Sequence, residues 1–333
     1  MSDQPSISVI FPTFNRCEVI RQTLHHLIAQ EYPQHLVQVL VCDNSTDETP
    51  EMVESVAAGA PIEIRLLRSA HSLPAVKRNE GLRAARGDLA LFLNDDVWVV
   101  PSFLRAHADA HRRLARPAAV LGYVEQSRAM DRRPFIEWYQ PFAYDRIADR
   151  AGGTVPFWFH WSMNLSLPRE VMIDRNLVFH EDWANIGHED VELGYRWTSA
   201  GYDVVYEPSA SGEHFHPHTL ASACRLQESV GRGLRDLDRL IPLPELHERY
   251  GLFSWKGSPK SVARGLARKA LFNRFSAPPL VRYFDRRDFD SRMAQWTYWK
   301  LMLWHTGQGY RNAAPRQSVP TPTFDVSSRA GTA

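Results

Sequence analysis

The chain of 333 residues is 44% hydrophobic and 23% charged, so it can form one large globular domain or two ordinary ones. Its three scattered cysteines exclude a disulfide framework or a structural zinc site. The first residues do not resemble a signal peptide, and no apolar run reaches the ~18 residues of a membrane span. We therefore expect a cytoplasmic protein.

The net charge of +1 conceals an uneven distribution. Residues 231–333 carry 18 Lys and Arg against 8 Asp and Glu, a net +10, whereas residues 1–230 carry a net −9. A basic C-terminal third indicates an anionic partner. An ordinary solvated surface is the alternative, and we expect no nucleic-acid partner.

The first hundred residues alternate between predicted strands and helices. Apolar runs predict strands at 6–11, 37–42, 62–67 and 89–93. Helical spacing predicts helices at 18–30, after 43–49 and at 73–85. This order predicts a doubly wound, mostly parallel α/β sheet. The glycine-rich phosphate-binding sequences of Rossmann and P-loop proteins are missing, which excludes those two kinds of nucleotide site.

The strand at 89–93 is followed immediately by Asn94, Asp95 and Asp96. Carboxylates at this end of a buried parallel strand lie where open α/β folds bind ligands. Adjacent carboxylates repel each other, and a divalent cation between them and a polyanion relieves that repulsion. The alternative is a polar turn that ends the strand.

The second half mixes strands, helices and irregular segments. We expect a helix at 101–114, a strand at 118–124, an acceptor-facing or merely inserted loop at 125–154, a strand at 155–167, a helix at 187–200 and a strand at 203–206. Asp190 lies in the first turn of the helix at 187–200. Alternation places His214, His216 and His218 on one face of an extended segment, an arrangement that suits a metal ion.

Beyond residue 220 the chain changes character. We expect a helical, basic and aromatic extension at 221–310, with helices at 218–241 and 258–275, and a disordered tail at 311–333. Lys260, Arg264 and Arg268 form a basic stripe at helical spacing.

Six segments together resemble the inverting family 2 glycosyltransferases of the GT-A fold, over roughly residues 7–220. They are S-V-I-F-P-T-F-N-R, V-L-V-C-D-N-S-T-D-E-T, A-V-K-R-N-E-G, L-A-L-F-L-N-D-D, W-S-M-N-L-S-L-P-R and G-H-E-D-V-E-L-G-Y-R-W-T-S-A-G-Y. The resemblance implies a single GT-A catalytic domain at 1–220, with a nucleotide-binding half (1–100) and an acceptor half (101–220). It also implies a nucleotide-sugar donor and a divalent cation, Mn²⁺ or Mg²⁺.

The resemblance also assigns roles to residues of this chain. It implies a catalytic base at Asp190 and metal ligands at Asp96 and His214. It implies nucleotide contacts at Pro12, Thr13, Asp43, Lys77, Arg78 and Asp95. Donor or acceptor sugar contacts are expected at Trp161, Asn164, Trp183, His188 and Glu189. Asn94 departs from the aspartate that is commoner at the first position of the acidic triplet.

Each assignment has a simpler structural alternative. Asp43 could cap the next helix, Glu189 and Asp190 could merely favour a helix N-terminus, and Arg78 could pair with a surface acid. The tryptophans and His188 could be core residues. Whether His216 or His218 also binds metal is open.

We therefore expect a metal-dependent inverting glycosyltransferase that uses a nucleotide sugar, with UDP ahead of dTDP and GDP. Its hydroxyl acceptor could be a glycan, a lipid-linked sugar or a small molecule. The alternatives are a non-catalytic nucleotide-sugar or glycan-binding protein and a sugar-phosphate nucleotidyltransferase. Because residues 258–305 combine basic charge with tryptophans, we also expect peripheral contact with an anionic membrane. Packing of these helices on the catalytic domain is the competing interpretation.

Overall fold

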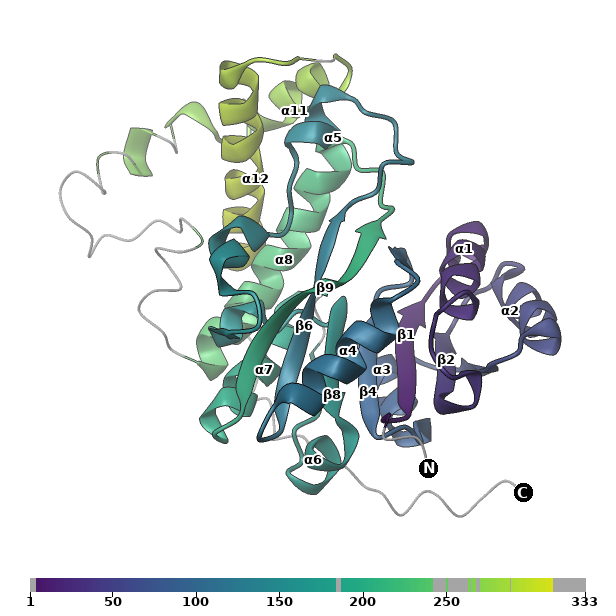
Figure 1. Ribbon diagram of the computed structural model, residues 1–333. Helices are drawn as coiled ribbons and strands as arrows, with labels where there is room; N and C mark the ends of the chain where they lie inside the picture. The colour runs from purple at the N-terminus through teal and green to yellow at the C-terminus, as the bar shows by residue number, and fades with distance from the viewer. Residues whose placement is uncertain are drawn as a thin grey trace.

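The computed structural model describes residues 4–183, 187–241, 250, 263, 265–267, 270–287 and 289–313 (Figure 1). The strands are β1 (Ile7–Thr13), β2 (Val37–Asp43), β3 (Glu63–Arg68), β4 (Leu89–Leu93), β5 (Val97–Val99), β6 (Ala118–Gln126), β7 (Thr154–Val155), β8 (Asn164–Pro168) and β9 (Asp203–His214). The α-helices are α1 (Cys17–Ile28), α2 (Thr49–Gly59), α3 (Pro74–Ala84), α4 (Phe103–Arg113), α5 (Pro134–Trp138), α6 (Arg169–Asp174), α7 (Glu189–Ser199), α8 (Leu220–Leu240), α11 (Ala277–Asp285) and α12 (Arg292–Asn312). Three 3₁₀ turns are η1 (Gln34–Leu36), η2 (Tyr144–Arg150) and η3 (Phe157–Phe159).

The strands form one sheet in the order β3-β2-β1-β4-β8-β6-β9-β5, and β7 pairs with β9. The first four strands of this order are parallel, and every residue of β2 and β4 is buried. Such uniform burial is what a parallel strand covered on both faces requires. The predicted α/β sheet is therefore confirmed, and its parallel part coincides with the clearest strand patterns of the sequence.

The second half of the sheet is mixed. Strand β8 is antiparallel to both β4 and β6, whereas β6 and β9 are parallel. The predicted strand at 155–167 is wrong over its first part, because η3 occupies 157–159 and β8 begins at Asn164. The predicted irregular segment at 125–154 contains α5 and η2.

Strand β9 extends far beyond its predicted end at residue 206. The β6–β9 register shifts where Gly122 faces Glu207 and Tyr123 faces Ser211. Pro208 falls within this irregularity, where its missing N–H costs no ladder hydrogen bond. The strand therefore continues to His214, and this continuation brings the histidine segment to the acidic triplet.

The C-terminal helices pack closely on the rest of the molecule. Helices α8 and α12 cross at Gly231 and Gly309, where an added Cβ would lie 2.0 Å from Thr306 O and 1.9 Å from Glu228 O, respectively. Leu234 and Leu237 of α8 belong to the main core, so α8 is continuous with the sheet domain. The division at residue 220 stays a prediction.

Several predicted features of the C-terminal part fall outside the described residues. They are Lys260, Arg264 and Arg268, residues 258–262 and 269 of the expected helix at 258–275, and residues 314–333 of the expected tail. The expectation that the disordered tail begins at residue 311 is wrong for its first two residues, because α12 continues to Asn312. In the part that is described, no helix is both long enough and apolar enough to cross a bilayer.

Candidate active site

The acidic triplet meets the histidine segment through a short antiparallel pairing. Strand β5 begins directly after the triplet and pairs with β9, so that Val97 lies opposite His214. One step further, Phe215 N donates to Asp96 O at 2.8 Å. This pairing, rather than the parallel sheet, determines which side chains face Asp96.

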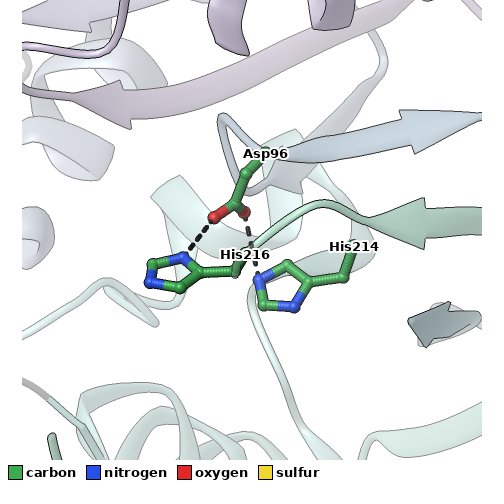
Figure 2. Close-up of side chains that lie close together, drawn as sticks. All are labelled: Asp96, His214 and His216. Carbon is green, nitrogen blue, oxygen red and sulfur yellow. Dashed lines mark hydrogen bonds and ion pairs between the residues drawn. The ribbon is translucent and has the colours of Figure 1, made fainter. Parts of the chain in front are cut away.

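Asp96, His214 and His216 form a cluster that could hold a metal ion (Figure 2). Asp96 Oδ1 lies 3.2 Å from His214 Nε2, and Asp96 Oδ2 lies 2.8 Å from His216 Nδ1. The three potential ligand atoms lie within 4.8 Å of one another. Asp96 is buried, yet its Oδ1 makes no hydrogen bond. A buried carboxylate whose Oδ1 makes no hydrogen bond, and whose two oxygens each face an imidazole, fits a divalent cation.

His218 is the third histidine of the segment 214–218, and it lies outside this cluster. Its ring stacks on His216 with centroids 4.2 Å apart, and its Nδ1 lies 3.3 Å from Ser222 Oγ at the start of α8. Burial and then the neighbouring His216 and His214 lower the pKa of His218 to about 3. The structure therefore places His216, and not His218, among the potential ligands.

Arg16 is a site residue that sequence reasoning missed. Its guanidinium bridges the two carboxylates, with Nη1 3.2 Å from Asp95 Oδ1 and Nη2 2.9 Å from Asp96 Oδ2. Thr13 Oγ1 donates to Asp95 Oδ2 at 2.8 Å. The sequence feature that could have identified Arg16 is its position three residues after Thr13, at the same edge of the sheet as the acidic triplet.

The two carboxylates differ in their protonation behaviour. Burial and then the charge of Asp96 raise the pKa of Asp95 to about 6, against the opposing effect of Arg16. Burial also acts to raise the pKa of Asp96, but His214, His216 and Arg16 outweigh it and hold that pKa well below its usual range. Asp96 is therefore the carboxylate that stays ionised, as a metal ligand must.

Lys77 and Arg78 are adjacent in α3 but have different partners. Lys77 Nζ donates to Thr13 O at 2.6 Å and to Asn44 Oδ1, so Lys77 lies at the ends of β1 and β2. Arg78 makes a buried ion pair with Glu189, at 2.9 Å between Nη1 and Oε1. The expectation that Lys77 or Arg78 meets a diphosphate stays a prediction, and of the two it is Arg78 that already pairs with a buried carboxylate.

Pro12, Thr13 and Asp43 lie together, because β1 and β2 pair with Pro12 opposite Cys42 and Thr13 opposite Asp43. Asp43 is fully buried; its Oδ1 accepts from Ser45 N at 2.9 Å and its Oδ2 pairs with Arg68. Helix α2 has no side-chain cap. The alternative that Asp43 caps this helix is therefore wrong.

Asp190 occupies the first turn of α7, as the sequence indicated. Its Oδ2 accepts from Ser162 N at 3.1 Å, and its Oδ1 accepts from Val191 N at 2.8 Å. Gly194 allows α7 to pack tightly on η3, because a Cβ there would lie 2.4 Å from His160 Cβ. Burial and then the charge of Glu189 raise the pKa of Asp190 to about 6, while Arg78 opposes this rise.

A short chain of contacts links Asp190 to the acidic triplet. Asp190 holds Ser162, the next residue is Met163, and Met163 O accepts from Asn94 N at 3.2 Å. Asp96 and Asp190 have different partners, so the ionised carboxylate that could bind a metal is separate from the partly buried carboxylate that could act as a base.

Of the remaining sugar-contact candidates, Asn164, Trp183 and His188 are buried and Trp161 is partly exposed. Asn164 is fully buried, with Oδ1 2.8 Å from His107 Nε2 and Nδ2 2.9 Å from Ala210 O, so its polar atoms already have partners within the fold, and the expected sugar contact stays a prediction. Trp183 is likewise buried and donates to Gly187 O. His188 lies against Tyr250, whereas Trp161 is partly exposed beside Phe142.

Residues 8–165 match the family model described as Glycosyl transferase family 2. The chain is 28% identical, over 267 residues, to the validoxylamine A glucosyltransferase of Streptomyces hygroscopicus subsp. jinggangensis. That alignment covers 72% of this chain and 63% of the relative, so the chain spans less than two thirds of the relative's length.

Two solved structures share the fold. One is the mannosyltransferase PcManGT from Pyrobaculum calidifontis in complex with GDP-Man and Mn²⁺, with a TM-score of 0.64, 20% identity, and coverage of 93% of this chain and 88% of that chain. The other is S. aureus TarS 1–349 in complex with UDP, with a TM-score of 0.52, 15% identity, and coverage of 96% and 97%, respectively.

Proposed function

Because the chain belongs to the family 2 glycosyltransferases and has the GT-A fold, we propose that it transfers a sugar from a nucleotide-sugar donor to a hydroxyl acceptor with inversion at the anomeric carbon. The observation that carries this proposal is the separation of two carboxylates. Asp96 is buried beside Arg16, His214 and His216, whereas Asp190 lies on α7 with a raised pKa. Inversion by single displacement requires such a division, since one carboxylate cannot both bind metal and accept the acceptor's proton.

The donor side of the proposed site is formed by the ends of β1, β2 and β4. Asp43 retains capacity to accept from the base, because a carboxylate has about four acceptor positions and its oxygens accept from Ser45 N and from Arg68. Lys77 and Arg16 supply positive charge beside the diphosphate. A divalent cation held by Asp96, His214 and His216 would stabilise the charge of the leaving diphosphate as a Lewis acid.

The acceptor side is organised by Asp190. Ser162 N and Val191 N hold its carboxylate in place, and Asp190 takes the proton from the acceptor hydroxyl as the new C–O bond forms. The bond between the anomeric carbon and the diphosphate oxygen breaks in the same step, and its electron pair leaves with the nucleoside diphosphate. A base with a pKa about 6 is ionised at neutral pH and still basic enough to assist this transfer.

The proposal is tested by screening UDP-, GDP- and dTDP-sugars with Mn²⁺ and measuring nucleoside diphosphate release with and without acceptors. Validoxylamine A, from the name of the relative, is a reasonable first acceptor. We expect one nucleotide to support acceptor-dependent release that EDTA abolishes, and NMR of the product to show the opposite anomeric configuration from the donor. Retention of configuration would contradict single displacement, and release from none of these donors would contradict the function itself.

The raised pKa of Asp190 predicts an acidic limb in the pH profile of kcat. The base acts only when deprotonated, so at saturating donor and Mn²⁺ kcat should fall below about pH 6, by about tenfold per pH unit. In Glu189→Gln the repulsion on Asp190 is lost and Arg78 is released, so the limb should move to lower pH. A limb that stays in place in this variant would assign the titration to another group.

A further inference from the structure

The exposed apolar side chains of this protein are concentrated at its C-terminal end. Seven of the eight exposed large hydrophobic residues of the described chain lie between 266 and 299, and the eighth is Phe14. Six of the seven, which we call the α11–α12 surface, are Leu271, Phe275, Tyr283, Met293, Trp296 and Trp299. Single exposed hydrophobic residues are ordinary, but a cluster of this kind marks a surface that meets an apolar partner.

Helix α12 divides into a buried face and an exposed aromatic face. Tyr298 and Leu301 are buried in the second core cluster, whereas Met293, Trp296 and Trp299 are 69%, 43% and 49% exposed. The interpretation that the tryptophan-rich segment simply packs on the domain is therefore right for one face of the helix only. Phe272 joins this surface to the preceding segment, since its ring lies 5.7 Å from that of Trp296.

Cations accompany the exposed aromatic rings. Arg274 lies over Phe275 at 4.6 Å, Arg287 over Tyr283 at 4.8 Å, and Lys300 over Trp299 at 3.7 Å from the ring centroid. The exposed arginines of this region are Arg274, Arg282, Arg286, Arg287 and Arg292.

Acidic side chains do not balance these cations. In the described part of 270–300, Asp290 is exposed, whereas Asp285 is half-buried and accepts from Ala221 N at 2.8 Å. The charge of the surface is therefore positive, in agreement with the net +10 of residues 231–333. An anionic partner complements it.

We propose that the α11–α12 surface docks on an anionic phospholipid bilayer. Tryptophan settles at the level of the headgroups, with its ring in the apolar part and its N–H toward water. Arginine matches headgroup phosphates with its planar set of donors. Aromatic and cationic side chains that alternate on one surface suit this interface, and the helices lie on the bilayer without crossing it.

The docking surface is close to the proposed site through the start of α8. Asp285 of α11 holds Ala221 N, and the next residue, Ser222, contacts His218. His218 in turn stacks on His216. A docked bilayer would thus be near the Asp96–His214–His216 cluster of the proposed site, which favours a hydroxyl acceptor carried in the same membrane, a lipid-linked one; this last step rests on the proposed function.

Co-sedimentation of the full chain with vesicles tests the docking. We expect binding to vesicles of equal phosphatidylglycerol and phosphatidylcholine, little binding to pure phosphatidylcholine, and release as salt shortens the Debye length from ~10 Å at 0.1 M toward ~3 Å at 1 M. Arg274→Glu with Arg292→Glu should weaken the partition to anionic vesicles at least about tenfold. The double variant Met293→Asp with Trp296→Ser should bind anionic vesicles more weakly than the unmodified chain at every salt concentration.

Two control variants test whether the loss of vesicle binding is specific to the α11–α12 surface or follows from any change of charge or hydrophobicity. Arg65→Glu reverses the charge of an exposed arginine of β3, and Phe14→Ser removes the exposed hydrophobic residue outside the region; both should bind vesicles like the unmodified chain. Equal binding to neutral vesicles, or a loss in Arg65→Glu as large as in the arginine pair, would overturn the proposal. A failure to bind anionic vesicles at low salt would also overturn the proposal. If sedimentation then showed dimers formed through the α11–α12 surface, the surface would be an interface between two copies of the chain instead. Because vesicle binding is measured without donor, these results do not depend on transferase activity.

Discussion

Replacement of Asp190 by asparagine is expected to lower kcat by about 10²–10⁴-fold, the usual contribution of a general base. The amide cannot accept the proton of the acceptor hydroxyl. Its oxygen can still accept a backbone hydrogen bond from Ser162 or Val191, and the loss of charge relieves repulsion with Glu189. Single-turnover kinetics with saturating donor measure the loss in the chemical step, and calorimetry should show unchanged donor and Mn²⁺ affinities.

Glu189→Gln is the matched control, because it makes the same chemical change one residue earlier in α7. It breaks a buried ion pair with Arg78 and should lower the free energy of unfolding by about 1–3 kcal/mol. At neutral pH it should leave most of kcat intact. If Asp190→Asn retained near-normal turnover, or if the two variants lost kcat equally, Asp190 would not be the base.

The parallel half of the fold was predictable because its strands are uniformly apolar. Buried strands such as β2 and β4 can be identified from composition alone, and their carboxyl ends then locate Asp43 and Asp96 at one edge. The position of Asp190 in the first turn of α7 was predictable from the helical pattern at 187–200, whereas its role as a base was implied only by the family resemblance and stays a prediction.

What could not be predicted depends on contacts between distant segments. The approach of His216 to Asp96 requires β9 to continue past Pro208 and pair with β5, and neither event leaves a hydrophobic pattern in residues 207–214. Asn164 was expected to contact a sugar only because it lies in a segment that resembles the family. Its partners, His107 and Ala210, come from α4 and β9 and only the folded chain brings them together. The partners of Arg16 and Arg78 lie 79 or more residues away for the same reason.

Asp96→Asn is expected to weaken Mn²⁺ binding at least about 100-fold, since loss even of a residue that only supports a metal ligand costs 10–100-fold. The charge of Asp96 is what the imidazoles of His214 and His216 and the guanidinium of Arg16 face. The asparagine keeps the shape of the side chain, so the fold should persist. Electron paramagnetic resonance of bound Mn²⁺ measures this effect without requiring turnover.

The stacked rings of His216 and His218 provide an internal control for the measurement of Mn²⁺ binding. His216→Asn removes a potential ligand and should also weaken Mn²⁺ binding, whereas His218→Asn removes only the ring stacked behind it and should leave the affinity close to that of the unmodified chain. Equal losses in both variants would mean that the stacked rings act through packing rather than ligation. Normal Mn²⁺ affinity in Asp96→Asn would remove the metal from this cluster altogether, and with it the proposed stabilisation of the leaving diphosphate.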